Sequence, residues 1–195
     1  MASQRTKGDN RTADRILDIA ERLVQTRGFN NFSYADIAKE LRITTASLHY
    51  HFRSKAELGH ALITRYAAQF GESLQRIDRE ISDARAKLEA YASLYASVLK
   101  GRRMCMCGIL AAEYQTLPRP MQRAVIGFFD DNQRWLAGVL DNGQRERTLA
   151  FSGSADEVAQ SILSTLEGAM LVARPYADLS KFNATARHLL SGLAN

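Results

Sequence analysis

A run of hydroxyl, imidazole and phenol side chains between residues 44 and 51 has the chemistry needed to contact DNA. Such groups donate and accept hydrogen bonds at base edges, and a small side chain such as Ala46 can contact a thymine methyl group. Ser33 and Lys55 suit phosphates, because a helix N-terminus and an ammonium group both attract anions. The predicted DNA-binding set is Ser33, Tyr34, Thr44, Thr45, Ala46, Ser47, His49, Tyr50, His51 and Lys55.

A second group of side chains, later in the chain, could bind a small organic molecule. Several tyrosines and phenylalanines and the Met-Cys-Met-Cys run at 104–107 would form an adaptable apolar site with polar tips, suited to an aromatic or moderately apolar ligand. Each member could instead belong to the hydrophobic core, and Glu113 could anchor a ligand or simply face water. The predicted effector-binding set is Tyr66, Phe70, Tyr91, Tyr95, Met104, Cys105, Met106, Cys107, Glu113, Tyr114, Phe128 and Trp135.

Cys105 and Cys107 suggest an alternative chemistry, in which a thiolate senses oxidants or electrophiles. They follow Lys100, Arg102 and Arg103, whose positive charges would favour the thiolate. The competing interpretation is that both are small buried hydrophobic residues. A disulfide between them would require local unwinding of the helix, and two cysteines alone do not predict a metal site.

The elements that must position both groups are helices, because apolar residues recur at helical spacing and strand-like alternation is absent. Ser33, Ser54 and Ser154 each precede an acid by three residues and predict helix starts, while Thr12 is the predicted N-cap of the first helix. Asn142-Gly143 predicts a helix end and 144–153 a loop. The pattern predicts about nine helices, at 12–27, 33–41, 44–52, 54–81, 84–100, 104–115, 119–140, 154–173 and 178–193.

Residues 33–52 have the spacing of a helix-turn-helix. One helix ends near Leu41, a short turn follows, and the next helix begins at Thr44 or Thr45, with the first helix supporting both from behind. The N-terminal residues of such a second helix can enter the major groove and contact base edges.

These residues resemble the DNA-binding signature of the TetR/AcrR family of bacterial transcriptional regulators, and the resemblance covers residues 11–62 closely. Two positions depart from it. Arg42 stands where glycine is usual, and a positive φ at this position would cost strain of about 1 kcal/mol. His49 stands where another aromatic residue is usual. The matching stretch is Phe29-x-x-Phe32-Ser33-Tyr34-x-x-Ile37-Ala38-x-x-Leu41-x-Ile43-Thr44-x-x-Ser47-Leu48-His49-Tyr50-His51-Phe52-x-Ser54-Lys55-x-x-Leu58.

The resemblance implies an all-α fold with two domains, a helix-turn-helix DNA-binding domain at 1–55 and an effector-binding and dimerisation domain at 56–195. It also implies a cytoplasmic homodimer that pairs through helices at about 119–140 and 155–173. This dimer would bind a palindromic operator in double-stranded DNA. Binding of a small molecule to the second domain would release a repressor from this operator. It implies no cofactor, no metal and no catalytic residues.

The charge distribution agrees with a DNA-binding N-terminal domain. The chain of 195 residues carries a net charge of +5, and residues 1–55 hold ten Lys and Arg against six acids, a net of +4. No apolar run is long enough to span a membrane, no secretory signal is visible, and no common catalytic motif occurs. A helical ligand-binding protein or an enzyme without DNA binding remains a more distant alternative.

Overall fold

The computed structural model describes residues 7–193, and within this range the chain is all helical. The helices are α1 (Lys7–Arg27), α2 (Tyr34–Leu41), α3 (Thr45–His51), α4 (Lys55–Glu80), α5 (Ala84–Lys100), α6 (Met106–Ala112), α7 (Arg119–Arg145), α8 (Ala155–Ala173) and α9 (Leu179–Ser191). Short 3-10 helices, Tyr114–Thr116 and Arg174–Tyr176, follow α6 and α8. The predicted all-α fold is therefore confirmed.

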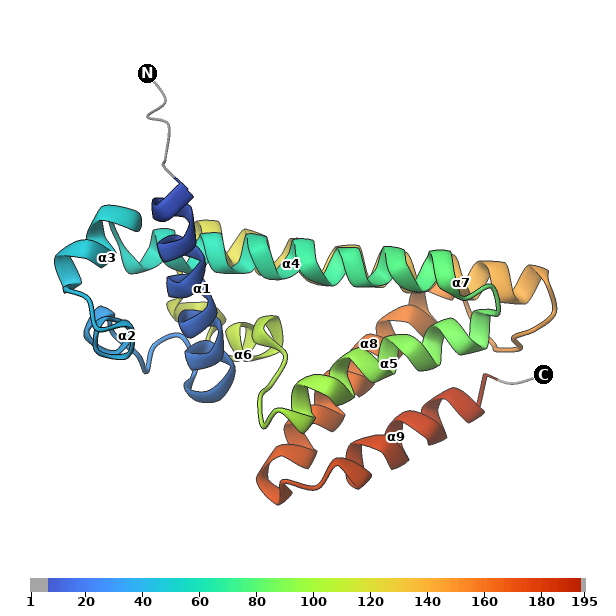
Figure 1. The fold of residues 1–195 in the computed structure, drawn as a ribbon. Helices are drawn as coiled ribbons and strands as arrows, with labels where there is room; N and C mark the ends of the chain where they lie inside the picture. Colours follow the sequence, from blue (N-terminus) through green and yellow to red (C-terminus); the bar gives the residue numbers. More distant parts are fainter. Residues whose placement is uncertain (1–6, 194–195) are drawn as a thin grey trace.

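Helices α1, α2 and α3 form a small unit, called the head, at one end of the long helix α4 (Figure 1). The remaining helices form the body, in which α7 packs on α8, α8 on α9, and α5 on α7 and α9. Helix α6 lies between the two units and packs against α1, α4 and α7 (Figure 1). Helix α6 therefore contacts both the head and the body.

Local hydrogen bonds explain why the helices begin where they do. The Ser33 and Ser154 hydroxyls accept the amide protons of Asp36 and Glu157, and both sites are complete capping boxes. Ser54 caps α4 in the same way through the amide of Glu57. The starts predicted from these three serines are confirmed.

Two predicted helix ends are wrong. Helix α1 begins at Lys7, so Thr12 lies inside the helix and does not cap it. Helix α7 continues through Asn142 and Gly143 to Arg145. Gly143 is needed there for close packing, because a Cβ at this position would come within 2.6 Å of a Leu149 methyl carbon. None of the helices within residues 7–193 combines the length and apolar character that a membrane-spanning segment needs.

Candidate nucleic-acid interface and ligand cavity

Helix α3 presents a polar outer surface, because its apolar residue Leu48 is turned into the head. Thr44, Thr45, Ala46 and His49 are exposed, and Tyr50 is 68% exposed. Thr44 caps the helix, accepting the amide proton of Ser47 at 3.2 Å. A capped helix with exposed side chains at its start has the geometry for entering a major groove.

Tyr34 links α2 to the end of α3 and supports His49. Its hydroxyl donates to the Phe52 carbonyl at 2.8 Å, and its ring lies 4.7 Å from the His49 ring. Burial, with a smaller contribution from Glu57, raises the pKa of Tyr34 to about 12, so the phenol stays protonated as a donor. The His49 Nδ1 pairs with the Arg53 carbonyl at 3.2 Å, which directs its Nε2 away from the helix end. Tyr34 and the Arg53 carbonyl therefore fix the orientation of the exposed His49 side chain.

The structure contradicts the prediction that His51 contacts DNA. His51 is only 4% exposed and lies inside the head, three residues after the buried Leu48 on the same helix face. The helical spacing from Leu48 therefore already indicated that the His51 side chain is buried. His51 is thus a core residue of the head.

Lys55 and Ser33 have roles within the head that the sequence did not predict. The Lys55 ammonium lies 4.3 Å and 4.7 Å from the ring centres of Phe32 and Phe29, and it donates to the Phe32 carbonyl. Burial lowers the pKa of Lys55, opposed by the charges of Glu113 and Asp36. The Ser33 hydroxyl donates to Asp36, whose carboxylate occupies the start of α2. Their phosphate contacts stay predictions.

Arg42 adopts a left-handed conformation, the case in which the sequence analysis expected strain. Its φ of 55° ends α2, and its amide donates to the carbonyls of Ala38 and Lys39. The turn of the helix-turn-helix thus has its usual shape with an arginine in place of glycine, at a cost of about 1 kcal/mol. The Arg42 side chain is exposed in this turn.

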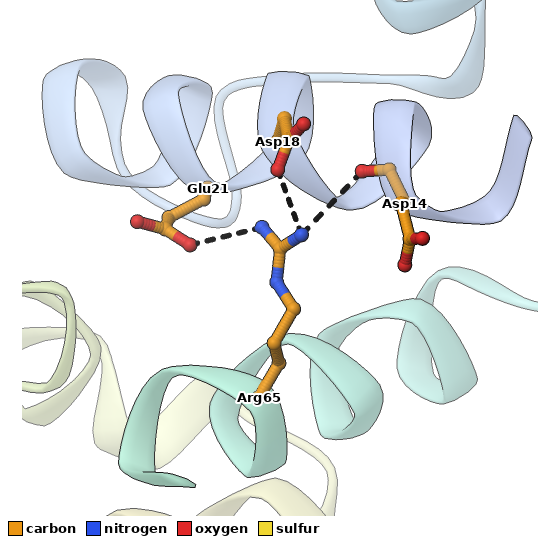
Figure 2. A network of polar contacts seen from close by, with 4 residues as sticks. All are labelled: Asp14, Asp18, Glu21 and Arg65. Carbon is orange, nitrogen blue, oxygen red and sulfur yellow. Dashed lines mark hydrogen bonds and ion pairs between the residues drawn. The ribbon is translucent and has the colours of Figure 1, made fainter. Parts of the chain in front are cut away.

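An ion-pair network fixes α1 on α4 at the boundary of head and body (Figure 2). The Arg65 guanidinium donates to Asp18 at 2.7 Å, to Glu21 at 3.0 Å and to the Asp14 carbonyl at 3.4 Å. The planar guanidinium can engage all three partners at once. The sequence did not predict this network, because its members are more than 40 residues apart.

Glu113, predicted to bind a ligand or face water, also holds the turn between α1 and α2. Its carboxylate accepts the amide protons of Phe29 at 2.7 Å and Asn30 at 3.4 Å. Gly28 makes this approach possible, since its φ is +89° and a Cβ there would lie 2.4 Å from Glu113 Oε1. Two further bonds cross the boundary, from the Met104 amide to the Gln25 carbonyl and from Arg174 to the Thr26 carbonyl.

Six of the predicted effector-binding residues form a packed aromatic cluster in the body. Phe70 contacts the rings of Tyr66, Tyr91, Tyr95 and Phe128 at 5.2–6.3 Å between ring centres. Trp135 stacks on Tyr91 at 5.5 Å. Tyr91 shares hydrogen bonds with Tyr95 and Asn132, each of 3.0 Å. The structure brings these residues together, and their contact with an effector stays a prediction.

The electrostatic basis of the thiolate hypothesis is wrong for this fold. Cys105 and Cys107 are buried, and burial followed by the nearby Glu167 carboxylate raises the pKa of both thiols. Arg102 is exposed, so its charge is screened by water. The thiols are therefore protonated and shielded, and Tyr66 donates a long hydrogen bond of 3.8 Å to the Cys105 sulfur. The competing interpretation, small buried hydrophobic residues, fits better.

Glu167 is a chemically important residue that the sequence analysis missed. It lies on α8 beside Gly108 of α6, whose Cα is so near that an added Cβ would be 2.3 Å from Glu167 Oε2. Burial raises its pKa to about 7, while the Cys105 thiol opposes this shift. An isolated acid among the apolar residues 158–172 was the available signal. A buried carboxylate with such a pKa marks a functional-site candidate.

Glu167 lines a cavity of about 430 Å³ at the meeting point of α1, α6, α7 and α8. Met104 and Glu113 are the members of the predicted effector-binding set that also line it. Its wall is largely apolar, and its edge reaches Arg27 and Gly28 at the end of α1. The volume suits a small organic ligand.

A helix-turn-helix head with an exposed α3, mounted on a helical body with a ligand-sized cavity, defines a DNA-binding regulator. Two family models match the chain: "Bacterial regulatory proteins, tetR family" over residues 16–62 and "Tetracyclin repressor-like, C-terminal domain" over residues 84–189. The chain belongs to the TetR family of bacterial transcriptional regulators.

Similar proteins support this assignment across the whole fold. A TetR family regulator from Agrobacterium tumefaciens is 32% identical, with a TM-score of 0.93 over 96% of this chain and 100% of that one. The transcriptional regulator AcuR of Cereibacter sphaeroides is 29% identical over 76% of this chain and 69% of its own length. The repressor NemR of Escherichia coli K12 is 24% identical over 84% of both chains. Regulation of transcription, rather than catalysis, is the activity of this family.

Proposed function

We propose that the protein is a homodimeric repressor that binds a palindromic operator and releases it when a small molecule binds the body. In each protomer, α3 would occupy the major groove. Thr45, His49 and Tyr50 would contact base edges, while Thr44 and Ser33 would lie near the phosphates. The protein would act in the cytoplasm, where its operator is.

The observation that carries this proposal is the exposed outer face of α3. A tyrosine exposed at 68% on a short helix contributes little to the core, so a role in recognition accounts for it best. The side chains on this face offer hydroxyl, imidazole and methyl groups, which suit base edges.

A second surface supports dimerisation. Ile126 on α7 and Leu171 and Val172 on α8 are exposed apolar side chains, at 46%, 63% and 64%. Gly127, Gly138 and Gly168 lie on the same two helices with open space above them, which would allow a partner helix to approach closely. Helices α7 and α8 are the pair that the sequence predicted for dimerisation, and a four-helix contact with a second copy would cover this surface.

Contacts between head and body suggest how an effector would act. Glu113 follows α6 directly and holds the α1–α2 turn, while Met104 precedes α6 and bonds to α1. A ligand that shifts α6 would therefore move the turn that orients α2 and α3. Such a shift would change the separation of the two α3 helices in a dimer and weaken operator binding.

The experiment that tests the proposal measures binding of the purified protein to its own upstream DNA at several salt concentrations. We expect sequence-selective binding whose affinity falls steeply with salt. Tyr50→Ala should weaken specific binding about tenfold, whereas Tyr176→Ala, at an exposed tyrosine of the body, should leave it unchanged. Binding that is absent or independent of sequence would refute the proposal.

A further inference from the structure

Glu167 is a buried acid without a compensating cation. It forms no ion pair with any described residue, and its Oε1 accepts no hydrogen bond from residues 11–193. The Cys105 thiol lies within hydrogen-bonding reach of this carboxylate, and its sulfur accepts a hydrogen bond from the Tyr66 hydroxyl. A buried carboxylate in this state is costly unless a proton or a positive ligand neutralises it.

The surroundings of Glu167 have the shape and polarity of a ligand site. The cavity of about 430 Å³ that it lines is walled by apolar side chains from three helices and the segment before α6. These side chains are Met104, Ile109, Ala111, Ala112, Phe129 and Leu171. Glu113 also lines this cavity, but its carboxylate accepts the amide protons of Phe29 and Asn30. A site with one buried, unpaired acceptor and a largely apolar wall favours a ligand with one strong donor and an apolar body.

We propose that this cavity is the effector site and that it binds a small organic cation. The ammonium group would pair with Glu167, and the apolar body would lie against Met104, Ile109 and Phe129. A charged hydrogen bond inside a cavity is stronger than one in water, whereas a neutral ligand would leave the carboxylate uncompensated and an anion would be repelled. The proposal rests on the ligand-responsive function above and adds the place and the chemical class of the ligand.

The rim of the cavity connects this site to the head. Arg27 and Gly28, the last turn of α1, contribute to the rim together with Glu113, which holds the Phe29 amide. A ligand would thus touch the segment on which the orientation of α2 depends. Arg27 and Arg174 also lie at the rim, but both are exposed, so water screens their repulsion of a cation.

A proton competes with the cation for Glu167. The titratable groups that face this carboxyl are Cys105, Cys107, Tyr66, Tyr91 and Tyr95, whose pKa values are all raised by burial, so they stay neutral near pH 7. Glu113, Arg27 and Arg174 complete the charged groups of the cavity. With a Glu167 pKa of about 7, the ionised fraction rises about tenfold between pH 6 and pH 8. Cation affinity should rise by the same factor.

Calorimetric titration of the full chain at pH 8 tests the site with benzylamine, phenethylamine, benzyl alcohol and benzoate as probes. We expect at least one of the two amines to bind ten times more tightly than the alcohol and the carboxylate, and Glu167→Gln to remove this preference. Asp156→Asn, an exposed acid on the same helix, should keep it. Equal binding of amine and alcohol, unchanged amine binding by Glu167→Gln, or no binding of either amine would overturn the proposal.

A second measurement needs no variant. At pH 7, binding of an ammonium group to a partly protonated Glu167 releases about half a proton to the buffer, so the heat should depend on the buffer's ionisation enthalpy. No proton release would contradict the pairing. If the protein binds its operator and saturating amine does not release it, the effector assignment is overturned. If the protein does not bind an operator at all, only the function proposed above is refuted.

Discussion

The head and the body satisfy their polar groups in opposite ways. In the head, Ser33 and Thr44 bond to amides only three residues along the chain, and the side chains with recognition chemistry point to solvent. In the body, Tyr91 and Asn132 bond across helices 41 residues apart, and Glu167 is buried. Local bonds shape the head, whereas the polar groups of the body depend on how its helices pack. The shape of the head therefore depends more on neighbouring residues, and that of the body more on tertiary packing.

The largest expected effect tests whether local capping alone holds the head together. Leu48 is fully buried, and Leu48→Ala should lower the free energy of unfolding by about 3 kcal/mol through lost burial and a cavity. Thr45→Ala, exposed on the same helix, should change it by less than about 0.5 kcal/mol. Urea unfolding measures both variants. If both variants lose only a small and similar amount of unfolding free energy, the helix caps, and not the core, stabilise the head.

Glu167, the buried acid of the body, should make the free energy of unfolding depend on pH, with a change nearly as large as that expected for Leu48→Ala. The pKa of Glu167 is raised from 4.5 to about 7 on folding, so the folded protein retains the proton longer than the unfolded chain does. Wild-type stability relative to Glu167→Gln should therefore fall by about 3 kcal/mol as the pH rises from about 4.5 to about 7, and stay constant above that. Thermal unfolding of both proteins across pH 4.5–8 checks this. If the stability of the two proteins changes with pH in the same way, the Glu167 carboxyl is in contact with water and not buried.

Replacing Lys55 shows whether its positive charge contributes to DNA binding or to the stability of the head. Because its ammonium group lies between Phe29 and Phe32, Lys55→Ala should lower the free energy of unfolding by about 1 kcal/mol. If the ammonium serves only the fold, the salt dependence of operator binding should stay as in wild type. A slope reduced by about one unit would assign Lys55 to a phosphate contact as well.

The smallest expected effect compares matched arginines in the two regions. Arg42 in the head and Arg102 in the body have φ values of 55° and 56°. Replacing either with glycine should relieve left-handed strain and raise stability by about 0.5 kcal/mol, once the greater freedom of glycine in the unfolded chain is counted. Denaturant midpoints measure the gain. A loss in Arg42→Gly alone would show that its side chain makes stabilising contacts in the head.

Much of the head was predictable because its signals are short in range. The capping residue Ser33, the apolar positions Ile37, Leu41 and Leu48, and the turn at Arg42 all lie within twenty residues. The predicted helices agree with the structure except at the start of α1, at the end of α7 and at α6, which is shorter than predicted and is followed by a 3-10 turn. At the end of α7 the reason is tertiary, since Gly143 serves close packing against Leu149 rather than a turn.

The sequence by itself determined the helical fold, the helix-turn-helix and the outward face of α3, because each follows from residues that are neighbours along a helix. Only the tertiary structure decided that Glu113 holds the α1–α2 turn, that Arg65 joins α4 to α1, and that Glu167 lies in a cavity behind α6. These pairings join residues far apart in the chain. Their energies depend on burial and distance in three dimensions, which the spacing of residues along a sequence does not specify.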